Sequence, residues 1–250
     1  MKKSIHSTKR HWSEGVMAYT RSQKRPLLGL LILTILLQIG GELKVSPQGE
    51  ASRPFSLLLH KTVITPLFHF AINSEYLKTK QMAQKIDHIL QYEQAPLTGS
   101  MQTKLAKQII NLAQQYQIDP YLILAIIKVE SSFDPKAHSY AGAMGIMQLL
   151  PIVIREVHQD FPQYSKRHHE DLLYNPLDNV QLGVHYFSSL LTRFRNDYQL
   201  ALTAYNMGPT AVVARLKNNQ VIPRGYAAKV FRYYRHYQQF QPRPQGLESI

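Results

Sequence analysis

The 250-residue sequence contains no cysteine and few acidic residues. The absence of cysteine excludes a disulfide, a thiol nucleophile and a lipid-anchoring cysteine near the N-terminus. Only 16 aspartates and glutamates accompany 29 lysines and arginines, which gives a formal net charge of +13. Such a chain is attracted to anionic surfaces, and charge alone does not decide between nucleic acid, phospholipid and the bacterial wall.

Several signatures of common chemistry are also missing. The sequence has no Gly-x-Ser-x-Gly elbow and no glycine-rich loop of the kind that cradles phosphate. The run His168-His169-Glu170-Asp171 lacks the histidine pair, four residues apart, of a zinc protease helix, so we interpret it as a solvated loop. We therefore expect no metal and no organic cofactor.

The N-terminal part is organised as an export signal. Residues 1–26 form a basic leader with seven lysines and arginines and one acid, and residues 27–41 are an apolar run closed by Gly40-Gly41. The uninterrupted part, LLGLLILTILLQI, is shorter than the about 20 residues of a membrane-spanning helix and fits the core of a signal peptide. We expect export, with the segment either cleaved or retained as a membrane anchor, and residues 42–100 as a spacer with a helical extension.

The rest of the chain favours a mainly α fold. Residues 101–239 contain successive segments with apolar residues at helical spacing and no hairpin pattern, which predicts one helical domain followed by a tail at 240–250. The tyrosines and arginines from Arg232 onward are typical of a terminal helix with its tyrosines on the core, so we expect no nucleic-acid partner. Helices are expected over 76–92, 101–117, 121–129, 152–160, 180–194, 198–205, 210–216 and 226–239, and a polar loop over 165–171.

One carboxylate, Glu130, ends the most apolar of these helices. Asp119-Pro120 is a typical helix start, with a capping side chain followed by proline at the first helical position. The residue before Pro135 is pushed out of helical geometry, so the helix stops soon after Glu130. Counting back by three, four and seven residues, Glu130 continues an inward-facing stripe of isoleucines at positions 127, 126 and 123.

This position favours an uncharged glutamic acid. Apolar neighbours and the negative end of the helix dipole both disfavour the carboxylate, so we expect a raised pKa for Glu130. A glutamate that keeps its proton near neutral pH can act as a general acid. From the helix alone, a surface glutamate that happens to end a helix remains an open alternative.

Three short motifs extend this interpretation. ESSFDP lies at 130–135, GIMQLLP at 145–151 and AYNMGP at 204–209. Together, over about residues 101–237, they resemble the soluble lytic transglycosylase (SLT) family, whose catalytic domain is similar to goose-type lysozyme and cleaves bacterial peptidoglycan. The resemblance implies a lysozyme-like (goose-type) helical domain.

The resemblance also implies a mechanism with a single carboxylate. Glu130 first protonates the oxygen that links N-acetylmuramic acid to N-acetylglucosamine, and then takes a proton from the muramic C6 hydroxyl, which closes onto C1. The product is a 1,6-anhydro sugar. Asp134 is close in sequence, but Asp-Pro after a helix is commonly a turn, and no second carboxylate shares the apolar setting of Glu130.

Eight further residues receive supporting roles from the same resemblance. Hydrogen bonds around the acid are expected from Ser139 and Tyr205, and contacts with the sugar amide and hydroxyl groups from Gln148 and Asn206. An apolar floor is expected from Met147 and Tyr226, and close approach of the backbone to the glycan at Gly145, as at Gly142.

The expected partners and location follow from these points. Peptidoglycan glycan strands are the expected substrate, the periplasm is the expected location, and the inner membrane is a further partner if residues 27–41 are retained. Two alternatives stay open: a muramidase that hydrolyses the same bond with water, and a non-catalytic wall-binding envelope protein with the same fold.

Overall fold

The computed structural model describes residues 65–157, 160–164 and 167–241. The chain divides into two units, Met1–Gln81 and Met82–Ile250, and the boundary falls inside the first described helix, α3 (Thr65–Tyr92). The leader, the apolar segment at 27–41 and the tail beyond 241 lie outside the described residues. Within the described part, no helix combines the length and the apolar character needed to cross a membrane.

The second unit is built from helices, as the sequence predicted. Its described residues contain no strand, and the only β-type pairing there is two isolated bridges, His138 with Met144 and Met144 with Leu149. After α3 the elements are α4 (Gly99–Tyr116), α5 (Pro120–Ser131), α6 (Pro151–Val157), the 3-10 helix η4 (Pro162–Tyr164), α7 (His169–Tyr174), α8 (Pro176–Arg193), α9 (Tyr198–Met207), α10 (Pro209–Lys217) and α11 (Gly225–Gln239).

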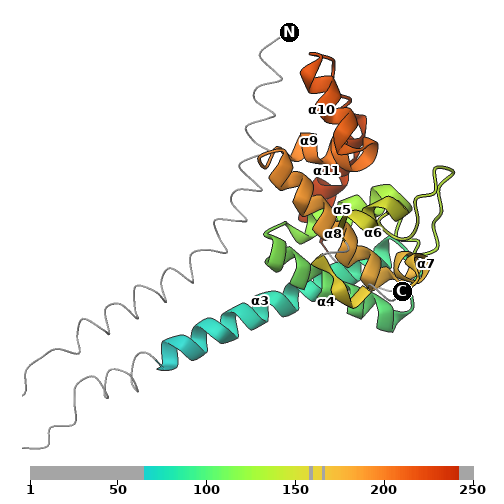
Figure 1. The fold of residues 1–250 in the computed structure, drawn as a ribbon. Helices are drawn as coiled ribbons and strands as arrows, with labels where there is room; N and C mark the ends of the chain where they lie inside the picture. Colours follow the sequence, from blue (N-terminus) through green and yellow to red (C-terminus); the bar gives the residue numbers. More distant parts are fainter. Residues whose placement is uncertain (1–64, 158–159, 165–166, 242–250) are drawn as a thin grey trace, which may run out of the picture. The chain divides into compact units, whose positions relative to one another are not determined.

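The central helix of this unit is α5, which packs against α4 and α11. Figure 1 shows α5 near the middle of the unit with α11 next to it. Every residue from Pro120 to Ile127 is buried, because the segment is apolar apart from the Tyr121 hydroxyl. The Asp119 side chain accepts the Tyr121 backbone N–H at 2.9 Å, so the expected cap and proline start are confirmed.

The last helix, α11, is fixed at its far end by polar contacts. The Tyr234 hydroxyl donates to the Asp119 carboxylate at 3.0 Å, and the Tyr237 hydroxyl donates to Glu93 at 2.8 Å. Glu93 also pairs with Lys128 of α5 at 2.7 Å. These contacts join α11 to the end of α3 and to the two ends of α5. The expectation that the terminal tyrosines lie on the core is confirmed for Tyr234 and Tyr237, both buried.

Two elements differ from the sequence-based expectation. The second unit begins at Met82, further toward the N-terminus than the domain start expected at residue 101, because Ile86, Ile89 and Leu90 of α3 are fully buried. The last three residues of the polar loop expected at 165–171 belong to α7, a six-residue helix with Glu170 and Asp171 in its first turn and two buried leucines, Leu172 and Leu173. Acids in a first turn complement the helix dipole, so this run fits a short helix as well as a loop.

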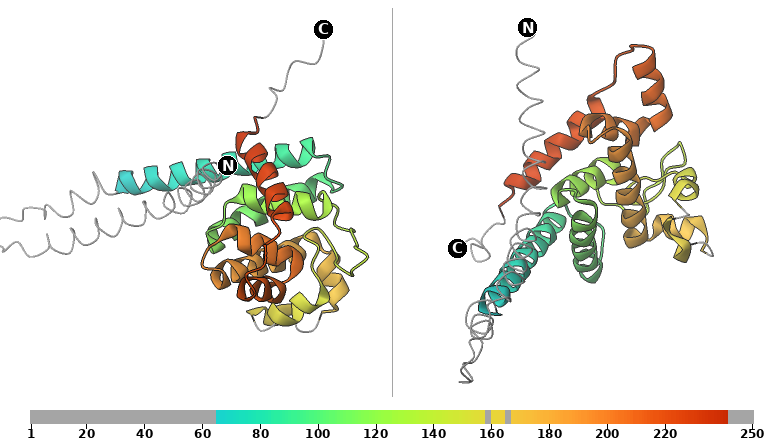
Figure 2. Two further views of the ribbon diagram at one scale, coloured as in Figure 1. Left: turned by 90° about the horizontal axis from the view of Figure 1, so that it is seen from above. Right: turned by 60° about the vertical axis from the view of Figure 1, so that its left-hand side comes forward.

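Helix α10 is packed less extensively than the others. It lies against α9, and Val212 is its only buried residue. Figure 2 (right) shows the segment 218–224 passing from the end of α10 to the start of α11. This segment delivers Tyr226 into the first turn of α11, where the candidate site begins.

Candidate active site

Glu130 lies in the last turn of α5 and is half-buried. The three isoleucines that precede it on the same face, at 123, 126 and 127, are 0–1% exposed, so the predicted stripe is confirmed. The helix ends at Ser132, whose backbone is left-handed (φ 53°) and whose N–H donates to the Lys128 carbonyl. The chain therefore turns away immediately after Glu130 and leaves its carboxyl group at the edge of the core.

Burial is the main influence on the acidity of this group. It raises the pKa of Glu130 from 4.5 to about 7, and the hydrogen bond from Tyr226 and the positive charge of Lys229 act in the opposite direction. A carboxyl group with this pKa exists in both protonation states near neutral pH. That balance suits a group that must first give up a proton and then take one back.

Tyr226 in the first turn of α11 is the direct partner of the acid. Its hydroxyl donates a hydrogen bond to Oε1 of Glu130. Burial and the neighbouring Glu130 charge raise the pKa of Tyr226 well above its usual range, so the hydroxyl stays protonated and remains a donor. The sequence-based expectation of an apolar floor from Tyr226 missed this contact, which joins residues 96 positions apart.

The loop between α5 and α6 is closed by its own hydrogen bonds. The Ser139 hydroxyl accepts the Ala143 N–H at 3.0 Å. The side-chain amide of Gln148 donates to the carbonyls of Ala137 and Gly145, both at 3.0 Å. Ser139 thus folds the loop and makes no described hydrogen bond to Glu130, contrary to its expected role. In Gln148 the amide nitrogen is used by the loop, and the oxygen Oε1 is the atom that remains for a ligand.

Asn179 of α8 attaches this loop to the helical core. It is fully buried, accepts the Met147 N–H at 2.8 Å and donates to the carbonyls of Met144 (3.1 Å) and Leu173 (2.8 Å). Ser131, directly after the acid, holds the same loop by donating to the Ile146 carbonyl at 2.7 Å. Sequence analysis missed Asn179, although an asparagine beside the inward stripe of α8 is a signal for a buried polar contact.

The glycine at 145 serves this attachment. Gly145 is buried with φ +77°, and a Cβ there would lie 1.9 Å from the Leu173 carbonyl oxygen. Glycine is therefore required at position 145 because the backbone packs closely against α7 and α8. This reason differs from the expected close approach of the backbone to a glycan. Met147 is also fully buried, and a Cβ added at Gly183 would lie 2.6 Å from its sulfur, so its side chain faces α8 and is no exposed floor.

The third motif, on α9, brings Tyr205 to the site, and Asn206 follows it in the chain. The Tyr205 hydroxyl donates to the Met147 carbonyl at 2.9 Å. Burial raises the pKa of Tyr205 well above its usual range, and the nearby Glu130 charge adds to the effect. Tyr205 therefore lies near the acid but bonds to the loop that surrounds it. Asn206 is exposed, with its side chain available to a ligand.

A second catalytic carboxylate is absent from the surroundings of Glu130 in the described residues. Asp134 accepts the Lys136 N–H at 2.8 Å and forms the expected turn. Asp119 is buried and burial raises its pKa, so it does share an apolar setting, contrary to the sequence-based statement. It lies at the opposite end of α5, about 16 Å away along the helix, outside the range of about 5–9.5 Å for paired glycosidase carboxylates.

The described residues contain no cluster of three or more histidine, aspartate or glutamate side chains suited to a metal ion. The groups that lie near one another here are one carboxylic acid and two tyrosine hydroxyls, Glu130, Tyr226 and Tyr205, and the neighbouring motifs add the side-chain amides of Gln148 and Asn206. Such a set can donate and accept one proton and can hydrogen-bond a polar, uncharged ligand.

Comparison with known families agrees with this arrangement. The transglycosylase SLT domain matches residues 107–223, a range that contains Glu130, the loop from Ser139 to Gln148, Tyr205 and Asn206. Residues 107–223 therefore form a domain of the SLT family. The family match stops just before Tyr226, the residue that bonds to the acid.

Two relatives of this chain are named membrane-bound lytic murein transglycosylase C. The one from Glaesserella parasuis is 32% identical over 164 residues, covering 58% of this chain and 43% of the relative. The one from Haemophilus influenzae is 30% identical over 194 residues, covering 68% of this chain and 53% of the relative. The chain thus spans about half the length of the curated relatives it matches.

Two solved structures are also similar. Lytic transglycosylase Slt from Pseudomonas aeruginosa shares 28% identity, with 54% of this chain and 24% of that chain covered and a TM-score of 0.47. The 70 kDa soluble lytic transglycosylase from Escherichia coli shares 25% identity, with 66% of this chain and 31% of that chain covered and a TM-score of 0.47.

Proposed function

We propose that this chain is a peptidoglycan lytic transglycosylase. It cleaves the β-1,4 bond between N-acetylmuramic acid and N-acetylglucosamine and leaves a 1,6-anhydro muramic end. The observation that carries the proposal is the state of Glu130: half-buried, with a pKa raised to about 7 and a hydroxyl donor on one carboxyl oxygen, inside an SLT domain.

In the first step Glu130 acts as the general acid. Its proton passes to the glycosidic oxygen as the bond to the muramic C1 breaks, and the carboxylate that remains is negative. Tyr226 donates to that carboxylate, and Lys229 stabilises it through its positive charge. Both interactions strengthen as charge develops, which is the form of stabilisation that lowers a barrier.

In the second step the same carboxylate acts as a base. It takes the proton of the muramic C6 hydroxyl, whose oxygen forms the new bond to C1, so no water is consumed. An intramolecular nucleophile is already held close to the reacting carbon and needs no separate activating base. The distance of Asp119 from Glu130 is consistent with a reaction that uses one carboxylate.

The remaining site residues divide into ligand contacts and positioning residues. The exposed amide of Asn206 and the oxygen of Gln148 contact the sugar's acetamido and hydroxyl groups. Tyr205, Ser139 and Met147 act by holding the loop that surrounds Glu130, through the hydrogen bonds described above.

We also propose an envelope location for this activity. Two relatives carry "membrane-bound" in their names, and residues 27–41 have the composition of an export or anchor segment. The enzyme then works on glycan strands in the periplasm, on the outer side of the membrane that the segment enters.

The products of digestion test this assignment. Purified sacculi are digested with wild-type protein and with Glu130→Gln, and the released fragments are weighed by mass spectrometry. We expect anhydro ends from wild type and loss of cleavage in the variant. Fragments heavier by one water would identify a hydrolytic muramidase, and binding to sacculi without cleavage by wild type would identify a non-catalytic wall-binding protein.

A further inference from the structure

The last quarter of the described residues carries positive charge and no acid. Residues 198–241, which form α9, α10 and α11, contain six lysines and arginines and no aspartate or glutamate. Elsewhere in the described part, acidic residues accompany the basic ones, and two ion pairs form, Lys128–Glu93 and Arg167–Asp178. The excess positive charge of the described part therefore lies on residues 198–241, while the basic leader 1–26 carries much of the rest of the chain's +13.

On α11 this charge lies on one face. Ala227, Val230, Tyr234 and Tyr237 are buried against the core, while Lys229, Arg232 and Arg235 are exposed on the other side of the helix. We call these three residues the cationic face of α11. Neither Lys229 nor Arg232 has a carboxylate within ion-pair distance among the described residues. The Arg232 guanidinium lies 5.6 Å from the ring centre of Tyr233, which orients it along the helix surface.

The cationic face begins at the active site. Tyr226 bonds to Glu130, and the positive charge of Lys229, one turn further along, lowers the pKa of the same acid. At about 1.5 Å per residue, Lys229 and Arg232 lie about 4.5 Å and 9 Å from Tyr226 along the helix. An anion bound on this face is therefore on the order of 5–10 Å from the acid, measured along the helix.

We propose that the cationic face of α11 binds the carboxylates of the stem peptide attached to the muramic sugar at the cleavage site. This inference rests on the proposed function. An extended peptide of four residues spans about 13–14 Å, enough to run from a sugar at Glu130 past Lys229 and Arg232. Stem peptides carry free carboxylates, and arginine pairs with a carboxylate through two parallel hydrogen bonds.

The charge of this face fits a substrate better than a membrane. A bilayer would attract all exposed cations alike, whereas Lys229 and Arg232 lie on the helix that carries Tyr226, in a row that starts at the acid. The row therefore makes the enzyme prefer glycan that still carries its peptides over glycan that has lost them. Because the side chains are exposed, the preference should weaken as salt rises.

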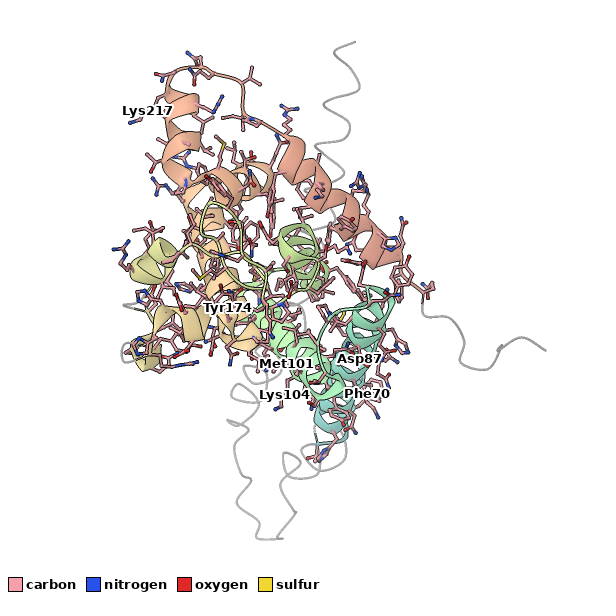
Figure 3. All side chains as sticks on the ribbon, turned by 90° about the vertical axis from the view of Figure 1, so that its right-hand side faces the viewer. Phe70, Asp87, Met101, Lys104, Tyr174 and Lys217 are labelled. Atoms are coloured by element: carbon pink, nitrogen blue, oxygen red, sulfur yellow. The ribbon has the colours of Figure 1, made fainter. Side chains whose placement is uncertain are left out.

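The test compares two substrates that differ only in their peptides. Sacculi are divided, and one half is stripped of stem peptides by an amidase. The value of kcat/KM is measured on both for wild type, Arg232→Glu and the charge-conserving Arg232→Lys. Lys104→Glu is the matched control, since Lys104 is also an exposed helical cation and lies well away from α11 in Figure 3.

We expect Arg232→Glu to lower the ratio of activity on intact over stripped sacculi about fivefold, with stripped glycan cut as by wild type. Arg232→Lys should keep most of the preference, and Lys104→Glu all of it. An unchanged ratio in Arg232→Glu overturns the inference, and so does a loss of binding to anionic lipid vesicles with no change in the ratio. If wild type cuts neither substrate, the proposed function itself fails.

Discussion

The hydrogen bond from Tyr226 to Glu130 makes a quantitative prediction for Tyr226→Phe. The substitution removes the hydroxyl donor and keeps the ring, so packing in the first turn of α11 is preserved. A hydrogen bond to a charged group contributes about 1.5–3 kcal/mol, and one pKa unit corresponds to about 1.4 kcal/mol. Because the bond favours the carboxylate, its loss should raise the pKa of Glu130 above about 7 by roughly one to two units.

The consequence for activity has a definite sign. Glu130 must be protonated to act as the acid, so activity falls as pH rises through its pKa. In Tyr226→Phe this descending limb should therefore move to higher pH by about one to two units. The maximum rate should fall about tenfold, because the carboxylate formed in the first step has lost its donor.

The assay is the pH dependence of kcat/KM on soluble glycan strands. Tyr233→Phe is the matched control: Tyr233 lies on the same helix, is half-buried and has its ring beside Lys128 and Arg232 rather than Glu130. Its profile should coincide with that of wild type. A Tyr226→Phe profile that coincides with both, or that moves to lower pH, would refute the reasoning.

Two further predictions concern stability. In the folded protein the pKa of Glu130, about 7, lies above its ordinary value of 4.5. The contribution of protonated Glu130 to the free energy of unfolding is therefore fully present below about pH 4.5 and is lost as pH rises through 7. The free energy of unfolding of Glu130→Gln, measured in urea, should therefore equal that of wild type near pH 4 and exceed it by up to about 3 kcal/mol near pH 8. Equal stability of the two proteins at both pH values would contradict this. Asn179→Ala should lower the free energy of unfolding by about 2–4 kcal/mol, because it leaves the Met147 N–H and two carbonyls without their partner. The exposed Asn218→Ala should change stability by less than about 0.5 kcal/mol, and a similar value for Asn179→Ala would argue against the anchoring role.

Local sequence signals predicted the setting of the acid. Asp119-Pro120 marked the start of α5, the isoleucine stripe marked its buried face, and Asp134-Pro135 marked its end. All three act within a few residues, which is the range over which capping and helical periodicity operate. The raised pKa of Glu130 followed from the same signals, since burial of the stripe also buries the residue that continues it.

The contacts that complete the site come from distant parts of the chain. Tyr226 and Asn179 reach their partners across 96 and 32 residues, and the sequence does not specify which hydroxyl or amide arrives where. The roles of Gly145 and Met147 were likewise hidden, because their neighbours on α7 and α8 become adjacent only after packing. Helix α7 was missed because its polar first turn resembles a loop until its two leucines are seen to be buried.

The most direct test of the central claim is the chemical form of the ends that Glu130 produces. Purified sacculi digested with wild type should release fragments with 1,6-anhydro muramic ends, and the same amount of Glu130→Gln should release none. Reducing ends from the wild-type enzyme, or anhydro ends produced by Glu130→Gln at the wild-type rate, would contradict the account.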